Sequence, residues 1–138
     1  MAHTTDPCLC GSKLPRNACC DPILSGTRPA TTAVALMRSR YTAYVTRNEA
    51  YLLDSWHPDV RPTRLDLDPR QRWLGLKILS TSAGTPTDSE GMVEFVARYK
   101  IDGRGHRLHE ISRFARTENG WFYVDGIRGP TDSRKEHS

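Results

Sequence analysis

Four cysteines lie within thirteen residues near the start of this 138-residue chain, as Cys8-Leu9-Cys10 and, after eight residues, Cys19-Cys20. No other cysteine occurs in the sequence. Two short-spaced pairs of thiolates match the tetrahedral preference of Zn²⁺, and the residues between them allow a turn that brings the pairs together. The spacing therefore predicts one Cys₄ zinc site. Because the protein supplies all four ligands, this zinc is expected to be structural.

Disulfides are the alternative use of these cysteines. Bonds within Cys8-Leu9-Cys10 or between Cys19 and Cys20 would be strained, whereas crossed disulfides or free thiols remain open. The N-terminal residues MAHTTDP contain no apolar signal segment, and no run approaches the roughly 18 apolar residues of a membrane span. We therefore expect a cytoplasmic protein with no membrane partner, a setting in which clustered cysteines more often bind metal.

The composition predicts a folded core rather than a disordered chain. Hydrophobic residues make up 37% of the sequence, which includes three Trp, three Phe and five Tyr. The formal net charge is +4, and the arginines are scattered among acidic residues rather than gathered in runs. This distribution argues against a dedicated nucleic-acid-binding surface.

The chain divides into four predicted units. Residues 1–22 form the zinc knuckle, residues 23–32 a linker rich in Pro, Gly, Ser and Thr, residues 33–130 the main domain, and residues 131–138 a flexible polar tail. Helical spacing of apolar residues predicts helices over 33–47, capped by Thr31 or Thr32, and over 50–56. Alternating residues then predict strands over 73–82, 91–101, 106–117 and 121–127. Helices followed by an antiparallel meander define an α+β fold.

Turn chemistry predicts which residues face the core. A four-residue loop at 102–105 would place Phe95 opposite Ser112, and a three-residue loop at 118–120 would place Phe114 opposite Val124. Glu110 and Ser112 then fall on the apolar face of the sheet, where a carboxylate needs a partner or a cavity. The expected partner is an arginine of the first helix. The predicted core face carries Val93, Phe95, Ala97, Tyr99, Leu108, Phe114, Phe122 and Val124.

Several segments resemble a known family. Cys8-x-Cys10-Gly11-Ser12 with Cys19-Cys20 resembles the SEC-C zinc motif, and LMRSRYTAY, SWHP, WLGL, FVARY and ISRF…GWFYVDG look like the YchJ family of SEC-C proteins. The resemblance implies a cone-shaped nuclear transport factor 2-like domain, a curved antiparallel sheet over helices with an internal pocket. It also implies a monomer or homodimer. The expected pocket residues are Arg38, Arg40, Tyr44, Trp56, His57, Phe95, Glu110 and Ser112.

The YchJ family has no settled activity, so three functional hypotheses follow. The first, which we prefer, is an interaction or ligand-binding protein, in which the zinc knuckle docks a protein or RNA and the cone pocket holds a small ligand. The second is a small-molecule enzyme that uses His57 and Glu110 as an acid/base pair. The third is a purely structural role for the polar residues of the pocket.

Overall fold

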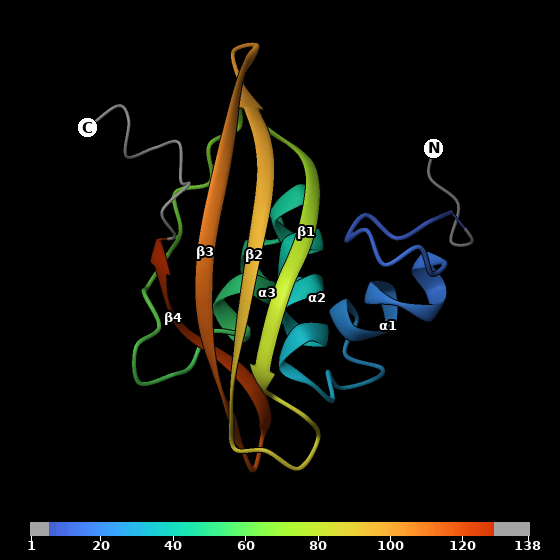
Figure 1. Ribbon diagram of the computed structural model, residues 1–138, viewed down its shortest axis with the longest axis vertical. Coiled ribbons are helices and arrows are strands. Elements are labelled where there is room, and N and C mark those ends of the chain that lie inside the picture. Colours follow the sequence, from blue (N-terminus) through green and yellow to red (C-terminus); the bar gives the residue numbers. More distant parts are fainter. Residues whose placement is uncertain (1–5, 129–138) are drawn as a thin grey trace.

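The computed structural model describes residues 6–128, so the predicted tail at 131–138 lies outside the described residues. Helices come first and strands follow, as the sequence predicted (Figure 1). After a short 3-10 helix, Arg16–Ala18, the elements are α1 (Cys20–Leu24), α2 (Ala33–Val45), α3 (Glu49–Asp54), β1 (Gln71–Ala83), β2 (Glu90–Ile101), β3 (Arg104–Thr117) and β4 (Gly120–Arg128). Figure 1 shows α2 and α3 against one face of the sheet, with α1 beside α2.

Side-chain caps set where the two main helices begin. The hydroxyl of Thr32 accepts a hydrogen bond from the backbone N–H of Ala35 at 3.1 Å, and Asn48 caps α3 in the same way. After α3, the backbone of Ser55 and His57 pairs with Tyr123 of β4 through two hydrogen bonds of 2.8 and 2.9 Å. This pairing replaces the last residues of the predicted second helix and ties the end of α3 to the sheet.

The four strands form one antiparallel meander in the order β1-β2-β3-β4. The turn between β2 and β3 has two residues, Asp102 and Gly103, both with positive φ (51° and 80°). These angles are those of a type I′ turn, for which Asp-Gly is a preferred sequence. The predicted four-residue loop was therefore wrong. Because the pairing moves by two residues, Phe95 lies opposite Glu110, yet the side chains of β2 and β3 keep their predicted faces.

The first part of β4 differs from the prediction by a single residue. The pairing shift expected at Gly120 occurs instead between Arg113 and Phe114, which leaves Val124 as the extra residue. Phe114 consequently pairs with Tyr123 rather than Val124. Trp121 and Tyr123 therefore take the inward positions predicted for Phe122 and Val124. Trp121 exposes only 5% of its surface, and its indole donates to the Thr31 carbonyl.

The N-terminal segment shares the core of the main domain. Cys8, Cys10 and Cys20 are buried in the same hydrophobic cluster as Leu36 and Tyr41 of α2. The N-terminal segment and α2 therefore contribute to one hydrophobic core. The predicted boundary between the knuckle and the linker, at residues 22 and 23, lies inside α1. The division of the chain into four units stays a prediction. No helix within residues 6–128 is long and apolar enough to cross a membrane.

Candidate functional site

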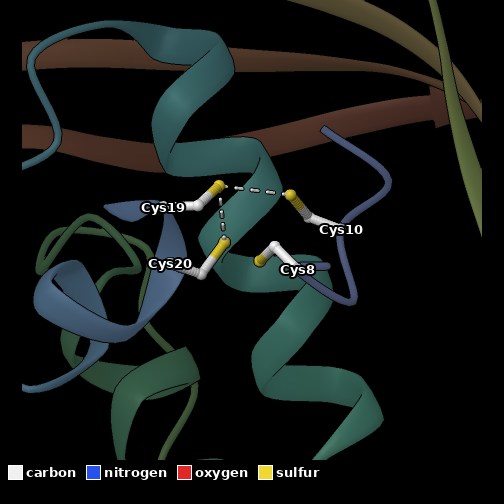
Figure 2. Close-up of side chains that lie close together, drawn as sticks. All are labelled: Cys8, Cys10, Cys19 and Cys20. Atoms are coloured by element: carbon white, nitrogen blue, oxygen red, sulfur yellow. Dashed lines mark hydrogen bonds between the residues drawn. The ribbon is translucent and has the colours of Figure 1, made fainter. Parts of the chain in front are cut away.

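The four cysteines converge on one point between the N-terminal loop and α1. Figure 2 shows the sulfur atoms of Cys8 and Cys10, from the loop, facing those of Cys19 and Cys20. All four Sγ atoms lie within 4.8 Å of one another, and none forms a disulfide. Three of the four side chains are buried, and Cys19 is partly exposed.

The sulfur spacing can be compared with that of a tetrahedral metal site. Zn–S bonds of about 2.3 Å at tetrahedral angles place sulfurs roughly 3.8 Å apart. The Cys10–Cys19 and Cys19–Cys20 sulfur distances are 3.6 and 3.9 Å. These two distances match that spacing, and the four cysteines could hold a metal ion.

Without a metal, the thiols do not share the negative charge equally. A hydrogen bond from Cys20 lowers the pKa of Cys10 to about 4, while the same bond raises the pKa of Cys20. Burial raises the pKa of Cys19 to about 11. One thiolate, on Cys10, is therefore favoured before metal binds, and a Cys₄ metal must displace protons from the remaining thiols.

Arg38 lies at this cluster, not in the pocket where it was predicted. Its Nη1 donates to the Cys10 carbonyl at 2.9 Å and approaches the Cys10 sulfur at 4.0 Å. Residues two apart on a helix point about 200° away from each other. Because Arg40 faces the sheet, Arg38 must face the knuckle, where its charge offsets that of the thiolates.

A cavity of about 310 Å³ lies between the helices and the inner face of the sheet. Six of the eight predicted pocket residues line it: Arg40, Tyr44, Trp56, Phe95, Glu110 and Ser112. Aromatic residues that the prediction left out supply much of the remaining wall, including Tyr41, Trp73, Tyr99 and Tyr123. Trp73 and Tyr99 lie opposite each other on β1 and β2, so the alternation of residues along these strands could have identified both as pocket residues. Tyr123 was predicted on the outer face because the bulge at Val124 was not expected.

His57 is the second predicted pocket residue that lies elsewhere. Because residues 55–57 run alongside β4, successive side chains point to opposite sides. Trp56 turns into the cavity and packs edge-on against Tyr123, whereas His57 packs near the outward ring of Phe122. The Nδ1 of His57 accepts from the backbone N–H of Asp59 at 3.2 Å. The predicted acid/base pair of His57 and Glu110 is therefore not assembled in this cavity.

Glu110 faces the cavity as predicted, but neither Arg38 nor Arg40 pairs with it. Its carboxylate accepts a hydrogen bond from Ser112 at 2.6 Å and one from Tyr123 at 3.4 Å. The nearest cation is Arg128 of β4, with Nη1 3.5 Å from Oε1. The strand pairing that sets Glu110 opposite Arg128 was not foreseen, since the predicted strand ended at residue 127.

The outer face of the sheet carries ion pairs. Arg113 and Asp125 form a two-bond pair at 2.6 and 2.7 Å, while Glu94 accepts from His109 at 2.7 Å and from Ser80 at 3.1 Å. The pKa values of Asp125 and Glu94 are lowered by these hydrogen bonds, from Arg113 and from His109. Such pairs on a sheet surface contribute modestly to stability.

These features define a class of protein: a four-stranded α+β domain, with a cavity between sheet and helix, carrying an N-terminal Cys₄ cluster able to hold a metal. Residues 32–126 match the family model for the YchJ middle NTF2-like domain. The chain belongs to the YchJ family.

Curated relatives and solved structures agree with this assignment. A "UPF0225 protein" of Streptomyces coelicolor is 50% identical over 122 residues, covering 88% of this chain and 95% of the relative. A "UPF0225 protein" of Geobacter sulfurreducens is 41% identical, covering 88% of this chain and 79% of the relative. The solution structure of a SEC-C motif containing protein from Rhodopseudomonas palustris aligns with a TM-score of 0.77 and 34% identity, over 87% of this chain and 96% of that one. The crystal structure of a second such protein, from Psychrobacter arcticus, aligns with a TM-score of 0.69 and 26% identity, over 94% of this chain and 82% of that one.

Proposed function

We propose that this protein is a cytoplasmic binding protein, in which a structural Zn²⁺ holds the N-terminal segment and the cavity beneath the sheet takes up a small ligand. The carrying observation is the cavity of about 310 Å³, whose walls are mainly aromatic and whose few polar groups converge on it. Preformed apolar pockets with a small number of placed polar groups are typical ligand sites. Zn²⁺ is the proposed metal because four clustered thiolates at tetrahedral spacing suit it well.

Binding is favoured over catalysis by the surroundings of Glu110. The predicted acid/base pair would need His57 at reaction distance from Glu110, and His57 lies outside the cavity. Glu110 instead holds hydrogen bonds to Ser112 and Tyr123 and lies near Arg128. This arrangement suits a fixed polar rim that orients a ligand. The cytoplasmic location is supported by four thiols that form no disulfide.

A fragment screen by NMR tests ligand binding. The full-length zinc-loaded protein is titrated with a panel of anionic, neutral and cationic fragments, and the shifted resonances are mapped. We expect at least one fragment class to shift the indole N–H signals of Trp56 and Trp73. Ala97→Leu, which fills the cavity, should abolish the shifts, while Arg98→Gln, on the opposite face of β2, should retain them. A panel with no cavity binder would contradict the proposal.

The zinc knuckle supports a second candidate function, the docking of a protein partner. Leu9 and Leu14 expose 40% and 52% of their surface on this small segment. Exposed apolar side chains on a rigid metal site favour a protein over RNA as the partner. The double variant Leu9→Ser and Leu14→Ser should keep its zinc but lose partners captured by the wild-type chain. Unchanged capture, or recovery of RNA instead, would contradict this function.

A further inference from the structure

Arg40 is a buried cation in the wall of the cavity. The residue exposes 3% of its surface, and its Nη1 donates to the Leu52 carbonyl at 2.8 Å and to the Ser55 hydroxyl at 2.6 Å. The guanidinium carbon lies 4.5 Å from the ring centre of Tyr123 and 5.3 Å from that of Trp56. These contacts hold the guanidinium in place between α2, α3 and β4.

No carboxylate compensates this charge within residues 6–128. No ion pair joins Arg40 to an acidic side chain of the described chain, and Glu110, the acid of the cavity, has Arg128 as its nearest cation. Burial lowers the pKa of Arg40, but an arginine stays protonated at neutral pH. Arg40 is therefore a buried cation with no acidic partner among the described residues, which is an unfavourable arrangement.

The hydrogen-bonding groups near Arg40 also favour an acceptor. The indole Nε1 of Trp56 is buried and has no acceptor among the described residues. The wall of the cavity thus combines the unmatched charge of Arg40 with a residue, Trp56, whose indole donor lacks a partner among the described residues. The rest of the wall is aromatic: Trp73 lies 5.7 Å from Tyr44 and 5.1 Å from Tyr99, between ring centres. Such walls favour flat rings over flexible aliphatic chains.

We infer that the cavity binds a compact aromatic carboxylate, with the anion directed to Arg40 and the ring packed among the aromatic side chains. This inference rests on the proposed ligand-binding function. One negative charge matches the single charge of Arg40, since Glu110 already has Arg128 beside it, whereas a phosphate dianion would bring excess negative charge into the cavity. A volume of about 310 Å³ lies at the small end of ligand pockets, which also favours a compact ring system.

The test compares two probes that differ in charge but have the same ring. Full-length zinc-loaded protein is titrated by NMR with indole-3-carboxylate and with its neutral amide, indole-3-carboxamide. We expect the carboxylate to bind about tenfold or more tightly than the amide, because a charge-assisted hydrogen bond is stronger than a neutral one. Both probes should shift the indole N–H signals of Trp56 and Trp73, which marks the cavity as the site.

Variants assign the preference to the cavity charges. Arg40→Met should remove the tenfold preference, whereas Arg98→Gln, on the outer face, should leave it unchanged. Because Arg40 also links α2 to α3, this variant can fail to fold; Glu110→Gln is then decisive. Removing the carboxylate of Glu110 should tighten binding of the carboxylate probe several-fold and leave binding of the amide unchanged.

The outcomes separate this inference from the proposed function. Equal binding of acid and amide, or a Glu110→Gln variant that does not favour the acid, overturns the anion preference but leaves a ligand-binding cavity. Tighter binding of neutral or cationic fragments does the same. Shifts confined to the outer face of the sheet also overturn it. If no fragment of any charge binds the cavity, the proposed function fails together with the inference.

Discussion

Gly126 gives the sharpest test of how Glu110 is held in the cavity. It lies in β4 opposite Ser112, and a Cβ atom added there would overlap Oε2 and Cδ of Glu110. Real Cβ atoms do not approach other atoms so closely, so Gly126→Ala must displace the end of the Glu110 side chain. The displaced carboxylate also loses its 2.6 Å hydrogen bond from Ser112.

The expected cost follows from these contacts. The atoms struck are the far end of a flexible side chain beside a cavity, so the cost is mainly the lost hydrogen bond to a charged carboxylate, about 1.5–3 kcal/mol. Replacing glycine with alanine in an unstrained position returns about 0.4–1 kcal/mol through the unfolded chain. We therefore expect Gly126→Ala to lower the free energy of unfolding by about 1–2 kcal/mol. Gly105→Ala is the matched control in β3, because its added Cβ meets nothing within 4 Å. It should be neutral or slightly stabilising.

Urea unfolding followed by tryptophan fluorescence measures both variants in the zinc-loaded protein. A double-mutant cycle with Glu110→Ala isolates the clash, because that second substitution removes the atoms that the added Cβ at position 126 would strike. The penalty of Gly126→Ala should shrink to a few tenths of a kcal/mol in that background. A Gly126→Ala protein as stable as Gly105→Ala, or a penalty unchanged by Glu110→Ala, would refute the placement of Glu110 over β4.

Three further predictions concern the metal site and the outer face. Metal analysis of reduced protein should find one zinc per chain, and Cys10→Ser should abolish it and lower the unfolding midpoint of the whole chain, because Cys10 is fully buried in the shared core; substoichiometric zinc in the wild type would contradict this. Arg38→Met should weaken zinc about tenfold in chelator competition, with Arg98→Met unchanged, since groups bonded to ligands tune metal affinity; equal zinc retention would dismiss that role. Hydrogen bonds from His109 and Ser80 depress the pKa of Glu94, so the contribution of Glu94 to folding stability is present above its unfolded pKa of about 4.3 and is lost as the pH falls through the folded value. Glu94→Gln should therefore make the free energy of unfolding less dependent on pH in acid. An unchanged pH dependence would show that Glu94 is not linked to stability.

The cysteine cluster and the fold class were readable from the sequence because both depend on local spacing. Two pairs of cysteines separated by eight residues can meet through one turn, so their convergence needed no knowledge of the rest of the chain. Period-two alternation gave Phe95, Glu110 and Ser112 the correct face even though the predicted turn was two residues too long. An even shift in pairing leaves side chains on the same side of a sheet.

The bulge at Val124 shows where that local reading ends. A bulge adds one residue to one strand, and nothing in the alternation of β4 says at which residue the extra one is inserted. Its position turned Trp121 and Tyr123 inward and so changed the wall of the cavity. His57 was misplaced for a related reason, since a backbone pairing with Tyr123 sets the side to which it points.

The sequence by itself determined the cysteine cluster, the order of helices and strands, and the polar residues on the inner face of the sheet, because each follows from neighbours along the chain. Tertiary structure alone decided which arginine serves which site. Arg38 and Arg40 are both arginines, two positions apart on α2. Because α2 packs between the knuckle and the sheet, Arg38 lies at the cysteines and Arg40 lines the cavity. Arg128 meets Glu110 only because β4 pairs with β3 beyond the bulge. Such choices depend on contacts between distant segments, which spacing along the chain does not encode.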